Sequence, residues 1–293
     1  MQRRGAIAAI VAGFSSPFLV GAGRFRGENT PAPDFAAIER KVAGRVGVAA
    51  LDVPTRRHLT YRAAERFPMC STFKWLLAAQ VLSLADAGQE QLSRIIPYSQ
   101  SDLLDYAPVA RAHVGAGGMT LSELLAAAIQ YSDNTAANLL LRVVGGPSSL
   151  TAYVRHLGDG ITRLDRTEPD LNSAVPGDVR DTTTPNAMVA DMEALLIGDQ
   201  LASASRAMLL AWLVGNTTGD GKLRAGFPTG WRIGDKTGTG AHGTTNDVAI
   251  IWPSTQRPLL VAVYLTDTTA ALTARNQALA AIGRAVAAWV RDV

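Results

Sequence analysis

The hydrophobic pattern divides the chain into strand-rich ends and a helical middle. Short runs rich in β-branched residues predict strands, the first two joined as a hairpin, over 45–53, 58–63, 231–236, 247–252 and 259–265. Apolar residues at helical spacing predict flanking helices over 35–42 and 270–290. The segments at the two ends therefore supply all the expected strands of one sheet.

Between these ends, helical spacing recurs with clear start and stop residues. Thr120 with Glu123 forms a capping box, and Thr184-Pro185 suits another helix start. The expected helices, most of them followed by glycine, cover 71–87, 121–131, 135–144, 184–197 and 205–214. The pattern predicts an α+β fold, in which an antiparallel sheet built from both chain ends is covered by helices and an all-α subdomain is inserted.

The expected organisation is a single catalytic domain over 34–293. Its α/β part covers about 34–65 and 216–293, and its all-α part covers about 66–215. At 293 residues and 47% hydrophobic content, the chain is long enough to bury a large core.

The first 22 residues have the features of an export signal. Arg3 and Arg4 precede a weakly apolar run, and small residues at Val20-Gly21-Ala22 suit a signal peptidase. The run is too interrupted to span a bilayer, and the lack of a nearby cysteine excludes a lipoprotein anchor. We expect a periplasmic or secreted protein, exported by the Sec rather than the twin-arginine route, with a flexible segment over 23–33.

Charge and cysteine content exclude several classes of function. A formal charge of +3 without a basic run argues against nucleic-acid or membrane partners. The one cysteine, Cys70, excludes an intramolecular disulfide, and its position predicts a small core residue. The four histidines lack metal-ligand spacing, so no metal and no cofactor is expected, and we expect a monomer.

The strongest chemical signal is Ser71 with Lys74 at the start of an apolar helix. Positions i and i+3 share a helix face, and burial lowers the pKa of a lysine, so its amine can take a proton from a nearby hydroxyl. The ordinary alternative is a helix-capping serine followed by a lysine whose stem alone is buried. A Ser-x-x-Lys pattern by itself does not decide between them.

Three further groups carry candidate chemistry. Ser132-Asp133-Asn134 lies in a break between two helices, where the alternative is a capping cluster. A strand ends in Lys236-Thr237-Gly238-Thr239-Gly240. Its glycines admit a ligand close to the backbone, and its free N–H groups could form an oxyanion hole with the N–H of Ser71. The alternative is a glycine-rich hairpin. An aperiodic segment containing Glu168 and Asn172 runs to about Asp181. Arg166 could close it by pairing with Asp181, and the alternative is that these loop charges are solvated.

Four motifs occur once each and in this order: Ser-x-x-Lys, Ser-Asp-Asn, Glu-x-x-x-Asn and Lys-Thr-Gly. With them, the chain resembles a class A serine β-lactamase from about residue 35 to the end. The resemblance implies the serine β-lactamase and penicillin-binding-protein fold and hydrolysis of the cyclic amide of penicillins and cephalosporins through an acyl-serine, conferring antibiotic resistance. It implies Ser71 as nucleophile, Lys74 and Glu168 as general bases, and Ser132 with Lys236 as the proton relay to the leaving nitrogen. Which of Lys74 and Glu168 dominates acylation stays open.

The resemblance also implies how the substrate is held. The backbone N–H groups of Ser71 and Thr239 form the oxyanion hole, and Glu168 with Asn172 holds the deacylating water. The other substrate-binding positions are Tyr106 as an aromatic gatepost, Asn134, Lys222, Thr237, Gly238 and Thr239.

One departure from the family pattern bears on the substrate carboxylate. Thr245 stands where many relatives have an arginine. Either Lys222 or Arg275 could replace that arginine, and the alternative for each is a solvated charge. Susceptibility to mechanism-based inhibitors therefore stays open. The ranking of penicillins, cephalosporins and carbapenems also stays open.

Two rival functions share part of the pattern. A penicillin-binding transpeptidase or carboxypeptidase has the serine, lysine and glycine-rich strand but lacks the Glu168 and Asn172 pair. A drug-sensing domain acylates without turnover and needs a transmembrane segment, which the hydropathy pattern does not supply.

Overall fold

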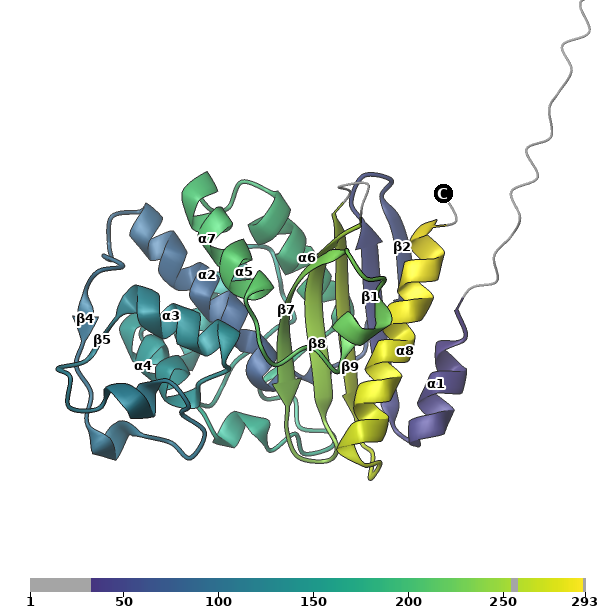
Figure 1. The fold of residues 1–293 in the computed structure, drawn as a ribbon, viewed down its shortest axis with the longest axis horizontal. Coiled ribbons are helices and arrows are strands. Elements are labelled where there is room, and N and C mark those ends of the chain that lie inside the picture. The colour runs from purple at the N-terminus through teal and green to yellow at the C-terminus, as the bar shows by residue number, and fades with distance from the viewer. Residues whose placement is uncertain (1–32, 254–257, 292–293) are drawn as a thin grey trace, which may run out of the picture. The chain divides into compact units, whose positions relative to one another are not determined.

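The computed structural model describes residues 33–253 and 258–291. Its main sheet has five antiparallel strands in the order β2-β1-β9-β8-β7. The strands are β1 (Arg45–Asp52), β2 (Arg57–Tyr61), β7 (Arg232–Thr239), β8 (Thr245–Trp252) and β9 (Leu259–Thr266). β1 pairs with β9 along its whole length, which joins the beginning and the end of the chain in one sheet and confirms the prediction (Figure 1).

Helices cover both faces of this sheet. Alternate residues of β9 enter two different cores: Val261, Val263 and Leu265 pack on one face, and Leu260, Ala262 and Tyr264 on the other. The first face is covered by α1 (Phe35–Val42) and α8 (Leu272–Arg291), the purple and yellow helices of Figure 1. The second face packs against the helical part of the chain. The edge strand β2 is only partly covered and leaves His58 and Thr60 exposed.

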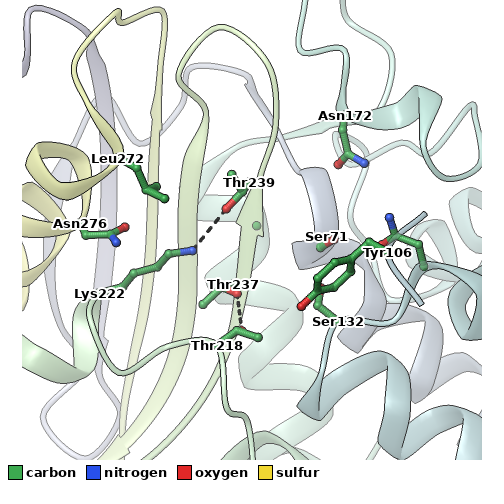
Figure 2. Close-up of a pocket in the computed structure, with 12 residues that line it drawn as sticks. Ser71, Tyr106, Ser132, Asn172, Thr218, Lys222, Thr237, Thr239, Leu272 and Asn276 are labelled. Carbon is green, nitrogen blue, oxygen red and sulfur yellow. Dashed lines mark hydrogen bonds between the residues drawn. The ribbon is translucent and has the colours of Figure 1, made fainter. Parts of the chain in front are cut away.

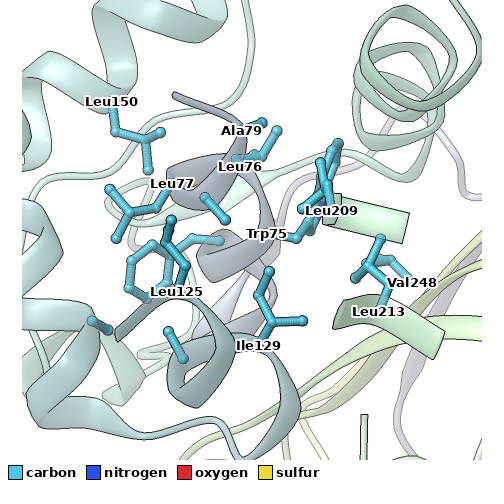
Figure 3. Packing of buried hydrophobic residues seen from close by; sticks show 14 of the residues in the cluster. Trp75, Leu76, Leu77, Ala79, Leu125, Ile129, Leu150, Leu209, Leu213 and Val248 are labelled. Carbon is cyan, nitrogen blue, oxygen red and sulfur yellow. The ribbon is translucent and has the colours of Figure 1, made fainter. Parts of the chain in front are cut away.

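The helical part is organised around α2 (Phe73–Asp86), which is apolar nearly all round and buried from Phe73 to Leu82. Around it pack α3 (Leu121–Gln130), α4 (Asn134–Val144), α5 (Pro147–His156) and α7 (Ser203–Val214), whereas α6 (Pro185–Met192) packs against β1 and β9. Figure 3 shows Trp75, Leu76 and Leu77 at the centre of this core. Short helical turns lie at Cys70–Thr72, Gln100–Asp102, Ala110–His113, Asp170–Asn172, Glu193–Ile197 and Leu223–Gly226.

Local chemistry explains the helix ends. The capping box of Thr120 and Glu123 is present at the start of α3, and Gly88 and Gly145 take the left-handed conformation after α2 and α4. Helix α5 was not predicted: it begins directly after the glycines that end α4, and only Leu150 and Val154 of it are buried. Two-stranded ladders join β3 (Phe67–Pro68) to β6 (Thr182–Thr183) and β4 (Ile95–Ile96) to β5 (Met119–Thr120).

Within residues 33–253 and 258–291, no helix combines the length and apolar content needed to cross a bilayer. The expected signal peptide over 1–22 and all but the last residue of the segment 23–33 lie outside the described residues.

Candidate active site

Ser71 lies in a single helical turn, Cys70–Thr72, that leads into α2. The expected helix start at residue 71 was wrong by two positions: α2 begins at Phe73. Cys70 has a positive φ of 45°, and its side chain is buried, which raises the pKa of its thiol. Asn246 on β8 fixes the approach to this turn by donating to the carbonyls of Pro68 (2.8 Å) and Met69 (3.1 Å).

Lys74 stands one turn deeper, with no exposed side-chain surface. Its Nζ contacts Glu168 Oε1 at 3.0 Å and donates to the Ser132 carbonyl (2.7 Å) and Asn134 Oδ1 (2.6 Å). Burial lowers the pKa of Lys74, and the charge of Glu168 partly opposes that effect. The buried-lysine prediction is therefore confirmed, and the alternative of a solvated amine is wrong.

The Ser71 hydroxyl donates to Glu168 Oε1 at 3.3 Å. One carboxylate oxygen thus contacts both the hydroxyl and the ammonium. Such a carboxylate can accept the serine proton while the neighbouring ammonium stabilises its charge.

Ser132 joins Lys74 to a second buried lysine. Lys236 Nζ donates to Ser132 Oγ at 3.0 Å and to the Thr237 carbonyl at 2.8 Å. Burial, reinforced by the nearby charges of Lys74 and Lys222, holds the pKa of Lys236 well below its usual value. Ser132 itself has a positive φ of 58°, and Asp133 next to it caps α4. The Ser-Asp-Asn group is therefore a helix cap and also part of this cluster.

Glu168 is held by its own loop and by α4. Arg166 Nε donates to Asp181 Oδ2 at 2.6 Å across the neck of the loop, as predicted. The side chain of Asn138 on α4 forms two hydrogen bonds with the backbone of Glu168: it accepts from the N–H (3.0 Å) and donates to the carbonyl (2.8 Å). Asn172 Nδ2 donates to Glu168 Oε2. The carboxylate is therefore fixed before any ligand enters.

A cavity of about 410 Å³ opens above these groups. Figure 2 shows Ser71, Ser132 and Tyr106 on its helical side, opposite Lys222, Thr237 and Thr239 from the sheet side. The remaining lining residues are Asn134, Asn172, Thr218, Gly238, Leu272 and Asn276. Every expected site residue except the buried Lys74, Glu168 and Lys236 lines this cavity, and those three lie directly beneath Ser71 and Ser132.

Two glycines at the end of β7 and just after it, Gly238 and Gly240, are required by the chain's own packing. A Cβ on Gly238 would lie 2.7 Å from the Met69 carbonyl, and one on Gly240 would lie 2.8 Å from the Asn172 carbonyl. Both glycines therefore let the end of β7 approach the nucleophile turn and the Glu168 loop, and Gly238 also lines the cavity. Thr239 lies at the rim of the cavity, on the side opposite Ser71.

Of the two candidate cations for a substrate carboxylate, Lys222 faces the cavity. Its Nζ lies 3.5 Å from Thr239 Oγ1. Burial lowers the pKa of Lys222, while the charges of Asp247 and Asp235 oppose that effect. Arg275 instead donates to Thr245 Oγ1 at 3.1 Å and does not line the cavity.

Sequence reasoning missed Asn138, Leu272 and Asn276. A single asparagine in a largely apolar helix gives no local signal, and the two α8 residues were assigned only to an amphipathic helix. A search for polar residues on the buried face of α4 would have found Asn138, because it lies one turn after Asn134 on the same face.

Comparison with known proteins points the same way. Residues 30–290 match the model of a protein family described as the beta-lactamase enzyme family. The chain is 48% identical to Beta-lactamase CTX-M-8 of Citrobacter amalonaticus, over 86% of each chain, and 48% identical to Beta-lactamase Toho-1 of Escherichia coli, over 88% of each. A solved structure of an ancestral (GNCA) class A β-lactamase has a TM-score of 0.87 and 56% identity, covering 88% of this chain and 99% of that one.

Proposed function

This chain belongs to the β-lactamase enzyme family, in class A, and we propose that its cavity hydrolyses the amide of penicillins and cephalosporins through an acyl-serine, conferring resistance to them. The observation that carries the proposal is the contact of one Glu168 oxygen with both the Ser71 hydroxyl and the Lys74 ammonium. That arrangement supplies a nucleophile, a base and a counter-charge within one buried cluster.

In acylation, Ser71 Oγ attacks the lactam carbonyl as its proton passes to Glu168. We assign this role to Glu168 because the Ser71 hydroxyl already donates to it. Lys74 directs its three N–H groups at three acceptors and so has no lone pair to offer while it is an ammonium. Lys74 acts instead by stabilising the carboxylate.

The carbonyl oxygen becomes negative during attack and is stabilised by the N–H groups of Ser71 and Thr239. Preorganised donors of this kind are worth about 2.7–4 kcal/mol each. Ser132 passes a proton to the leaving nitrogen and is resupplied by Lys236, whose lowered pKa favours release of that proton.

Before deacylation, the proton that Glu168 accepted returns to Lys236 through Lys74 and Ser132, which lie in hydrogen-bond contact along that path. Glu168 is then a carboxylate again and activates a water together with Asn172. Asn172 Oδ1 is buried and has no partner among the described residues, and buried polar atoms are normally paired. A water hydrogen-bonded to both Asn172 Oδ1 and Glu168 would satisfy that acceptor and stand next to the acyl bond.

The substrate is held from both sides of the cavity. Lys222, Thr237 and Thr239 bind its carboxylate, Asn134 binds its side-chain amide, Gly238 gives the backbone room and Tyr106 borders the entrance. Tyr106 is 52% exposed, so an incoming ring can cover it.

We also propose that the enzyme is exported and acts as a monomer. Its cavity lies, in this proposal, between an α/β part (about 34–65 and 216–293) and an all-α part (about 66–215). The export signal, the basis for the first of these, lies in the sequence before the described residues.

Steady-state hydrolysis of benzylpenicillin, a cephalosporin and a carbapenem by purified enzyme, with and without clavulanate, tests the function. We expect turnover of the first two and its loss in Ser71→Ala. Turnover by Ser71→Ala at the wild-type rate, or no turnover by the wild type, would contradict the proposal.

A further inference from the structure

A second cavity, of about 460 Å³, lies between α1 and α8, on the sheet face opposite α2. These two helices pack directly against each other (Figure 1). None of the residues proposed for catalysis or substrate binding lines it. We refer to it as the α1–α8 cavity.

Helical spacing explains its apolar walls. The lining positions of α8 recur every three or four residues, which places them on one face of that helix. Most of them are alanines, whose short side chains leave the space that longer residues would fill. The apolar lining consists of Ala37, Ile38 and Val42 of α1 and Ala274, Ala278 and Ala281 of α8.

The charged residues at this cavity have one sign. Lys41 and Arg284 both line it, and neither forms an ion pair with the described residues. No aspartate or glutamate lines it in the described part of the chain. The acidic residues of the α1 segment are turned to other partners: Asp34 pairs with Arg40, and Glu39 pairs with Arg62. The cavity therefore combines an apolar interior with two uncompensated cations.

We propose that the α1–α8 cavity binds a single-chain carboxylate amphiphile, with the alkyl chain between the alanines and the carboxylate between Lys41 and Arg284. Ligand sites are typically about 300–1,000 Å³, mainly apolar, with a few polar groups that orient the ligand. A fatty acid of medium chain length satisfies both halves of this surface. The inference does not depend on the proposed hydrolysis.

Charge also argues against two other occupants. A second copy of the chain docked by a twofold axis would bring Lys41 and Arg284 toward the same cations of its partner. Residues 23–32 carry Arg24 and Arg26 against Glu28 alone, so that stretch has the same sign as the cavity.

Titration calorimetry of the full chain with decanoate, below its micelle concentration, tests the proposal. We expect saturable one-to-one binding whose affinity rises from hexanoate to octanoate to decanoate. The gain per methylene is at most about fourfold, the ratio that corresponds to full burial of one CH₂. Decyltrimethylammonium, with the same chain and a positive head, should not bind. Absence of saturable decanoate binding, or equal binding of the cation, would overturn the proposal.

Variants locate the site. Ala281→Phe fills the cavity and should weaken decanoate binding at least tenfold, and Ala37→Phe provides the same test from the other wall. Arg284→Gln should weaken binding about threefold, whereas the matched control Arg284→Lys keeps the charge and most of the affinity. Benzylpenicillin turnover should be unchanged in all of them and reports correct folding. Unchanged decanoate affinity in both phenylalanine variants, or its competition by benzylpenicillin, would place the ligand elsewhere and refute the inference.

Discussion

Asn138→Ala tests whether the loop that carries Glu168 must be anchored by α4. The side chain makes two hydrogen bonds to the Glu168 backbone, at 3.0 and 2.8 Å. At about 0.5–1.5 kcal/mol each, their loss removes about 1–3 kcal/mol of anchoring and leaves both backbone groups without that partner. Because Glu168 is itself only 3% exposed, the change acts on a packed segment.

The expected kinetic effect follows from position. A misplacement of a catalytic group by about 1 Å can cost about a hundredfold in rate. We therefore expect kcat for benzylpenicillin to fall between about tenfold and a hundredfold, with a Tm several degrees lower. Stopped-flow measurement should show that deacylation slows at least as much as acylation, because the water is held by Glu168 and Asn172 together.

The matched control is Asn186→Ala, which changes an exposed asparagine of α6 and should leave both kcat and Tm near wild type. An Asn138→Ala enzyme with the kcat of the wild type would refute the idea that this clamp positions Glu168. A lower Tm with unchanged kcat would assign Asn138 a role in stability only.

Two further predictions concern buried charges. Burial and the neighbouring Asp159 hold the pKa of Asp191 well above its usual value. Between the unfolded and the folded pKa, the unfolded chain therefore binds fewer protons than the folded protein. The free energy of unfolding consequently falls as the pH rises through that range. Asp191→Asn stays neutral, so in urea titrations it should lose less stability than the wild type as the pH rises above the unfolded pKa of about 3.9, by up to about 1.4 kcal/mol for each pH unit. Equal pH slopes for the two proteins would contradict this. Lys222→Gln should lower kcat/KM for benzylpenicillin roughly tenfold, mainly through KM, because about 1.5 kcal/mol of a charge-assisted hydrogen bond is lost. Lys222→Arg should retain most of it, and an unchanged KM in Lys222→Gln would exclude the carboxylate role.

The sequence predicted the fold well where local chemistry and packing agree. Strands with β-branched runs and helices bounded by glycine, proline or a capping box were placed close to their observed ends. Helix α5 was missed because Pro147, its first residue, follows two glycines that mark the end of α4, and only Leu150 and Val154 of it are buried. The start of α2 was misplaced because the turn Cys70–Thr72 is fixed by tertiary contacts, including those of Asn246.

The site was predictable in composition and less so in detail. Motif spacing indicated Ser71, Lys74 and Glu168. No local pattern shows, however, that one oxygen of Glu168 contacts both the Ser71 hydroxyl and the Lys74 ammonium. The packing role of Gly238 and Gly240 was not predicted, because their neighbours, Met69 and Asn172, are distant in the sequence. Contacts between segments that are distant in the sequence depend on the fold as a whole, so the spacing of residues along the chain does not predict them.

The most direct test of the central claim is the fate of the acyl-enzyme in Glu168→Gln. The glutamine keeps the shape of the side chain but cannot act as a base, whereas Lys74, relieved of its counter-charge and with a lowered pKa, can still accept the Ser71 proton slowly. Mass spectrometry after mixing with benzylpenicillin should show an adduct of the whole drug on the Ser71 peptide that persists in the variant and disappears from wild type once the drug is consumed. Wild-type turnover by Glu168→Gln, or an adduct on any other residue, would contradict the account.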